Sequence, residues 1–188
     1  MDGPKKIKIT DEKIALAKAE HFCAYQERAQ QEVRDKLYEW GLWPEAVENI
    51  IVKLIGDNFL NEERFAKAYT RGKFKQKKWG RVKIKQGLKL KKVPEGLIKK
   101  AMQTIDAEEY IKTLYNVLAK KSEILKEKDP YKRRYKLQQY AMGRGFESDL
   151  IGDVLGEGFW KLSLLQSILC WWVQLNFFKW CDFVIFEL

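Results

Sequence analysis

The chain has 188 residues, 33% of them charged and 46% apolar, a composition typical of globular proteins that excludes a disordered chain. Gly and Pro number only 12 and 4, which favours an all-α protein over a β-rich one. The formal net charge of +10 indicates an acidic partner such as a polyanion.

The first ten residues, "MDGPKKIKIT", contain no apolar core of a signal peptide, so we expect a disordered N-terminus and a cytoplasmic protein. Helical segments are then expected at residues 11–27, 61–76 and 106–126, each ahead of a pair of shorter helices. Asn61 and Asp106 are the expected N-caps of the second and third segments, and Asp106 with Glu109 fits a capping box.

The helix pairs repeat along the chain with periods of 51 and 53 residues. In each pair, five apolar positions follow one another at steps of 4, 5, 5 and 4. They are Val33, Leu37, Leu42, Val47 and Ile51, then Ile84, Leu88, Val93, Ile98 and Met102, then Leu137, Ala141, Phe146, Ile151 and Leu155. A repeat of this length predicts an array in which neighbouring units bury one another's apolar faces.

Each pair contains a predicted break between its helices. Gly41 and Gly145 mark the break in the first and third units, where a left-handed residue can end a helix, whereas Lys92 occupies this position in the second. Pro44 and Pro94 are expected to open the helices that follow.

We therefore predict three tandem three-helix repeats that form an elongated curved array. The expected boundaries are 1–10 for the disordered N-terminus, 11–60, 61–105 and 106–157 for the three repeats, and 158–188 for an apolar C-terminal extension.

Charge is segregated along this array. Residues 64–100 hold fifteen Lys or Arg against one acid, Glu95, a net of +14, whereas residues 11–63 hold twelve acids and six bases. Helical spacing places most of the cations of residues 64–89 outward from the apolar face, on two adjacent helices. We call this set the basic corner: Arg64, Arg71, Lys73, Lys75, Lys77, Lys78, Arg81, Lys83, Lys85 and Lys89. Such a corner matches phosphates, although a solvated face without a partner remains the alternative.

Aromatic residues in the same stretch suggest base stacking, but Phe65 and Tyr69 lie on the predicted apolar face, which favours core packing. Trp79 lies with Gly80 at the break between the two helices and is expected to be more open.

Signals for chemistry are weak. The sequence has no GxxxxGK[ST], GxSxG or HExxH motif, and its three cysteines form no CxxC pair. His21, the only histidine, has no second ligand pair, and Glu62, Glu63 and Glu95 are too scattered for a metal-dependent nuclease. We expect a binding protein that is not an enzyme and needs no metal or cofactor.

The stretch "NEERFAKAYTRGKFKQKKWGRVKIKQGL" resembles the signature of the RecX family of bacterial modulators of the RecA recombinase. The matching residues include the structural positions Phe65, Tyr69, Trp79, Gly80, Ile84 and Leu88, besides Glu63, Arg64, Ala66 and Arg71. "YQERAQQEVRDKLYEWG" resembles the family's first repeat, and the resemblance covers residues 16 to 156.

The resemblance implies a protein that binds the RecA filament on single-stranded DNA and inhibits its ATPase, strand exchange and SOS co-protease activities. It also implies roles in DNA repair and homologous recombination, with RecA and single-stranded DNA as partners and duplex DNA as a further candidate. The alternatives are a sequence-tolerant DNA-binding array that acts without RecA, and a membrane-tethered adaptor.

The C-terminal extension differs from the rest, since residues 159–188 contain 21 apolar residues in 30. Packing against the array or a second copy, a non-native or frame-shifted extension, and a membrane anchor all remain open, and the membrane anchor is least favoured. The protein is expected to be a monomer unless this extension self-associates.

Overall fold

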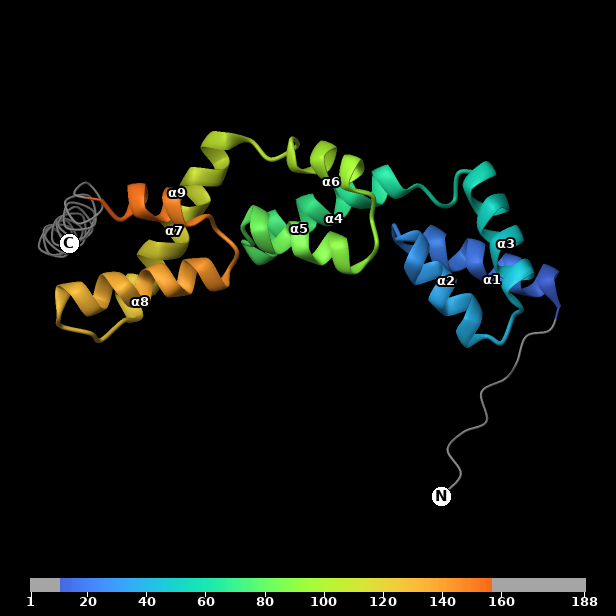
Figure 1. Cartoon of the computed structure of the whole chain (residues 1–188), viewed down its shortest axis with the longest axis horizontal. Coiled ribbons are helices and arrows are strands. Elements are labelled where there is room, and N and C mark those ends of the chain that lie inside the picture. Colours follow the sequence, from blue (N-terminus) through green and yellow to red (C-terminus); the bar gives the residue numbers. More distant parts are fainter. Residues whose placement is uncertain (1–10, 157–188) are drawn as a thin grey trace, which may run out of the picture. The chain divides into compact units, whose positions relative to one another are not determined.

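The computed structural model describes residues 11–156, and within that range it contains nine helices and no strand (Figure 1). The helices form two compact units divided at Ala107, with α1 to α6 in the first and α7 to α9 in the second. Their bounds are α1 Glu12–Tyr25, α2 Gln30–Glu39, α3 Pro44–Gly56, α4 Glu62–Lys77, α5 Arg81–Leu90, α6 Glu95–Met102, α7 Ala107–Ile124, α8 Pro130–Gly143 and α9 Ser148–Val154. The prediction of an all-α chain of three-helix repeats is confirmed. The expectations for residues 1–10 and 158–188 lie outside the described residues.

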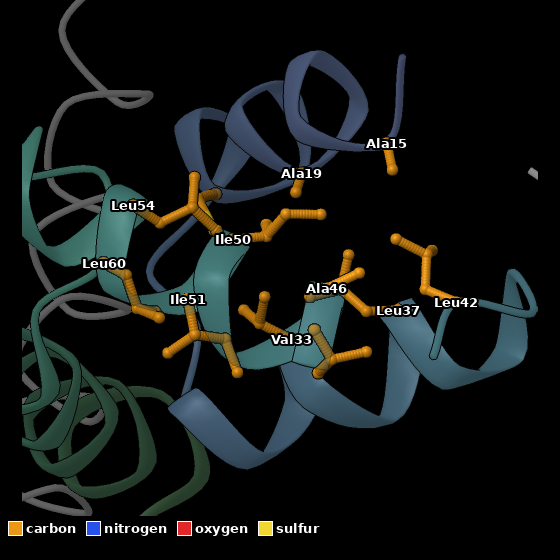
Figure 2. Packing of buried hydrophobic residues seen from close by; sticks show 12 residues of the cluster. Ala15, Ala19, Val33, Leu37, Leu42, Ala46, Ile50, Ile51, Leu54 and Leu60 are labelled. Carbon is orange, nitrogen blue, oxygen red and sulfur yellow. The ribbon is translucent and has the colours of Figure 1, made fainter. Parts of the chain in front are cut away.

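The first repeat buries one apolar cluster among α1, α2 and α3 (Figure 2). Ala15 and Ala19 are fully buried on one face of α1, and their small side chains allow this helix to approach α3 closely. Cys23 continues the same face, and burial raises the pKa of its thiol. This cysteine is therefore a core residue that stays protonated and unreactive.

The second and third repeats use the same positions for their cores. Every position predicted from the 4, 5, 5, 4 spacing is buried except Met102, which is half-buried while the adjacent Ala101 is fully buried. In the third repeat Tyr110 of α7 is also buried, packs against Phe146, and donates a hydrogen bond of 2.5 Å to Glu147.

The three helix breaks share one geometry. Gly41, Lys92 and Gly145 have φ angles of 92°, 57° and 89°, so Lys92 adopts the left-handed conformation that glycine adopts in the other repeats. In each repeat the residue after the left-handed one donates a backbone hydrogen bond from its N–H to the carbonyl five residues earlier. These bonds run from Leu42 to Leu37, from Val93 to Leu88 and from Phe146 to Ala141. The absence of glycine in the second repeat has not changed the turn.

The helix starts follow the predictions in part. Asn61 caps α4 by accepting a hydrogen bond from the N–H of Arg64, and Pro44 is the first residue of α3, as expected. Pro94 was predicted to be the first residue of α6 but is its N-cap, because it aligns with Trp43 rather than with Pro44. The helix α7 begins directly after Asp106.

Polar contacts join the first two repeats within the first unit. Arg64 of α4 contacts Glu27 in the α1–α2 loop at 2.5 Å, and Glu62 accepts a hydrogen bond of 3.1 Å from the N–H of Gln30. Lys91 forms an ion pair with Glu32. These contacts fix the orientation of the helices that carry the basic corner.

Within residues 11–156, no helix has the length and hydropathy needed to cross a membrane.

Candidate anion-binding surface

The outer face of α4 carries a row of cations three or four residues apart, Arg64, Lys67, Arg71 and Lys75, and the exposed Lys78 follows this row as the C-cap residue. The opposite face is the buried one, with Phe65, Ala66, Thr70 and Phe74. Because side chains at these spacings are neighbours on a helix surface, the row forms a continuous line of positive charge.

Carboxylates compensate the N-terminal half of this row. Arg64 binds Glu27, and its guanidinium also donates to the side chain and the carbonyl of Asn58, each at 3.1 Å. Lys67 pairs with Glu63 at 2.7 Å, which lowers the pKa of that carboxyl. Arg64 was expected to face outward as part of the basic corner, but these bonds make it a contact between the repeats.

The C-terminal half of the row differs. Arg71, Lys75 and Lys78 are exposed, and neither Arg71 nor Lys78 has an ion-pair partner in the described part of the chain. We call these three residues the exposed row. Lys78 has a left-handed φ of 53° and ends α4, so its side chain leaves the helix at the carbonyl end, where positive charge is favourable.

Two more lysines are held close to the end of α4 by Trp79. The ammonium of Lys73 on α4 lies 5.0 Å from the centroid of this indole, and that of Lys83 on α5 lies 4.9 Å from it. Such cation–π contacts are favourable and restrict both side chains. Trp79, which was expected to be more open than the aromatic residues of the apolar face, is half-buried and contacts lysines from both helices.

Tyr69 positions α5 against α4. Phe65 is buried as predicted, whereas Tyr69 is only half-buried, and burial followed by the charge of Glu32 raises the pKa of its phenol. A Cβ atom added at Gly87 would overlap the Tyr69 hydroxyl and lie 3.2 Å from its Cζ atom. The glycine therefore lets the ring cross α5 closely.

On α5, the basic corner is partly neutralised by an acid of the next helix. Lys85 and Lys89 both bind Glu95 of α6, at 2.8 and 3.2 Å. Hydrogen bonds from Lys85 and then Lys89 lower the pKa of this carboxyl. Sequence spacing could not reveal these pairs, because ten residues separate Lys85 from Glu95.

The remaining predicted cations, Lys77, Arg81 and Lys83, lie around the same α4–α5 junction, with Lys77 exposed and the other two half-buried. The structure thus brings one part of the basic corner together around Trp79 and commits another part to contacts with carboxylates. Ammonium and guanidinium groups with aromatic side chains are suited to phosphate or carboxylate ligands. No group of three possible metal ligands occurs within residues 11–156, and His21 lies exposed on α1.

Three family models match successive parts of the chain. They are described as the first, second and third three-helix domains of RecX, and they match residues 15–54, 61–102 and 108–155. The matched ranges coincide closely with the three helical repeats.

Curated proteins with similar sequences are named Regulatory protein RecX. The protein of Prosthecochloris aestuarii is 30% identical over 148 residues, which cover 79% of this chain and 95% of that protein. The protein of Clostridium perfringens strain 13 is 32% identical over 130 residues, covering 68% of this chain and 60% of its relative. The chain therefore spans about 60% of the length of the Clostridium perfringens relatives.

Solved structures share the fold. The crystal structure of RecX from Lactobacillus salivarius matches with a TM-score of 0.71 at 22% identity, covering 78% of this chain and 95% of that chain. A second, titled regulatory protein RecX, matches with a TM-score of 0.69 at 24% identity, covering 74% and 68%.

Proposed function

The chain belongs to the RecX family, and from this premise we propose that it regulates RecA by binding the RecA filament on single-stranded DNA. In this proposal it inhibits the filament's ATPase, strand exchange and SOS co-protease activities, and so restrains recombinational DNA repair and the SOS response. It acts by binding, without catalysis.

The exposed row is the observation that carries the proposal. Arg71 and Lys75 follow one another on one face of α4, Lys78 follows them at the C-cap, and Lys73 and Lys83 are held nearby by Trp79. Neighbours at this spacing are about 5–6 Å apart, so the row can contact several phosphates of one strand. Three such contacts on a single strand release about two condensed counterions, which corresponds to a slope of roughly −2 when the logarithm of the binding constant is plotted against that of salt concentration.

Inhibition follows if the protein binds one state of the filament more tightly than another. A ligand shifts a conformational equilibrium only by its difference in affinity between the two states. In this proposal the helical repeats contact neighbouring RecA protomers and the enclosed DNA strand at the same time. Binding therefore favours the filament state in which both contacts can form together. That state is then slower to hydrolyse ATP or to accept incoming DNA.

The test is RecA-dependent ATP hydrolysis on single-stranded DNA, titrated with the protein. One variant carries Arg71→Glu, Lys75→Glu and Lys78→Glu. Its matched control carries Lys13→Glu, Lys18→Glu and Lys53→Glu, exposed positions on α1 and α3 with the same change in net charge. We expect the first variant to need at least about tenfold more protein for half-inhibition, and the control to inhibit like the unmodified protein. Lack of inhibition by the folded, unmodified protein would refute the proposal.

The alternative is a sequence-tolerant DNA-binding protein that acts without RecA, which the same exposed row would serve. Binding to labelled single-stranded and duplex DNA in the absence of RecA distinguishes the two. The alternative is favoured if the protein binds DNA without RecA at the same protein concentrations at which it inhibits ATP hydrolysis. The proposal also includes a cytoplasmic location and a monomeric state, the latter measurable by sedimentation.

A further inference from the structure

The third repeat has an additional helical turn that the other two repeats lack. The helices α2 and α5 begin three residues before their first core positions, Val33 and Ile84. The helix α8 begins seven residues before the equivalent Leu137. The extra turn, residues 130–133, contains no buried residue, so the core of the repeat does not require it.

This turn is nevertheless firmly held. Asp129 caps it by accepting hydrogen bonds from the N–H groups of Tyr131 and Lys132, at 2.9 and 3.2 Å. The guanidinium of Arg133 donates to the carbonyls of Ser122, Leu125 and Glu127, at 2.5, 2.8 and 3.2 Å, and to the Ser122 hydroxyl at 2.8 Å. Ser122 lies in the last turn of α7, and Leu125 and Glu127 follow that helix, so Arg133 ties the start of α8 to the end of α7.

The first two turns of α8 present two tyrosines to solvent. Tyr131 is 82% exposed and Tyr135 is 58% exposed, and their spacing of four residues places them side by side on α8. Aromatic side chains usually bury most of their surface, because they gain more from burial than other residues do. Two adjacent exposed rings at the firmly held start of α8 are therefore suited to a ligand that covers them.

Cations surround the tyrosines. Residues 120–136 hold eight Lys or Arg against three acids, a net of +5. Lys126, Lys128, Lys132 and Arg134 are exposed and have no ion-pair partner among residues 11–156. Glu127 pairs instead with Lys136 at 2.6 Å, and Asp129 is engaged as the cap. Beside Tyr131, a hollow of about 520 Å³ is lined by Lys128, Pro130, Tyr131, Arg133 and Arg134.

We propose that the start of α8, with the loop before it, is a second nucleic-acid-binding site, at which Tyr131 and Tyr135 stack on bases of a single strand and the four cations bind its phosphates. A rise of 1.5 Å per residue sets the two rings about 6 Å apart along α8. Stacked bases in a duplex are only about 3.4 Å apart, so bases that meet both rings belong to an extended, unstacked strand. The site goes beyond the proposed function, since it needs neither RecA nor the exposed row.

The experiment measures binding of the full chain to labelled oligo(dT) and to a duplex by fluorescence anisotropy, without RecA. It uses the variant with Arg71→Glu, Lys75→Glu and Lys78→Glu as background, so that the second repeat does not mask the third. Adding Tyr131→Ala and Tyr135→Ala should weaken oligo(dT) binding at least about tenfold, since each stacked base contributes about 1–3 kcal/mol. Adding Tyr131→Phe and Tyr135→Phe, which keeps the rings, should leave it unchanged.

Several results would overturn the proposal. If the background variant already fails to bind oligo(dT), the third repeat has no site of its own. If the alanine and phenylalanine variants bind alike, stacking is not involved. If the alanine variant loses duplex and oligo(dT) affinity equally, the surface does not select a single strand and would instead fit any acidic surface, including that of a protein. Because RecA is absent throughout, failure here leaves the proposed function untouched.

Discussion

Replacing Lys92 by glycine should stabilise the second repeat. Lys92 has a φ of 57° at the helix break, where Gly41 and Gly145 serve in the other repeats with the same backbone hydrogen bonds. A left-handed conformation costs a residue with a Cβ atom about 1–2 kcal/mol. Glycine avoids this cost but loses about 0.4–1 kcal/mol through the greater freedom of its unfolded chain. The expected net gain is therefore about 0.5–1 kcal/mol.

Lys92 is exposed and has no ion-pair partner within residues 11–156, so loss of its charge should contribute little. The matched control is Lys92→Ala, which removes the same charge but retains the Cβ atom. Thermal unfolding followed by circular dichroism should show a rise of about 2–4 °C in the transition of the first unit for Lys92→Gly, and no rise for Lys92→Ala. Equal effects of the two substitutions, or no gain from glycine, would refute the argument from backbone conformation.

Two further predictions concern α4 and its neighbours. Arg64→Lys keeps the positive charge but cannot reproduce the hydrogen bonds to Glu27 and Asn58. Chemical denaturation should therefore show that the free energy of unfolding falls by about 1–2 kcal/mol, while DNA affinity is unchanged. A weaker DNA affinity with unchanged stability would instead place Arg64 in the ligand contact. Gly87→Ala should displace Tyr69 and lower the free energy of unfolding by about 1–3 kcal/mol. Adding Tyr69→Phe should recover part of that loss, because it removes the overlapping hydroxyl. No recovery in the double variant would mean that the overlap is relieved elsewhere.

The core of each repeat could be predicted from the sequence because helix packing imposes a fixed spacing on buried side chains. The steps between Leu137, Ala141 and Phe146, for example, match those between Val33, Leu37 and Leu42, and all six residues are buried. The start of α6 was misplaced by one residue because Pro94 resembles Pro44 in type but not in register.

The basic corner could be predicted only in part. A net of +14 over residues 64–100 suggests a uniform surface, but folding brings Glu27 to Arg64 and Glu95 to Lys85 and Lys89. Such pairings depend on tertiary structure and leave no local pattern. The tyrosines of α8 had a visible signal in their spacing and in the surrounding lysines, but the early start of α8 is evident only from the structure.

The polar contacts between the first two repeats have a consequence for any titration with salt. Glu27 with Arg64 and Glu32 with Lys91 are partly exposed pairs, and added salt screens such pairs. Ionic strength therefore acts twice on this chain, once on the contacts between cations and phosphates and once on the contacts that orient α4 and α5. A plot of affinity against salt should be steeper than the number of bound phosphates alone would give. Chemical denaturation at each salt concentration, without DNA, reports only the contacts between the repeats and would therefore separate the two contributions.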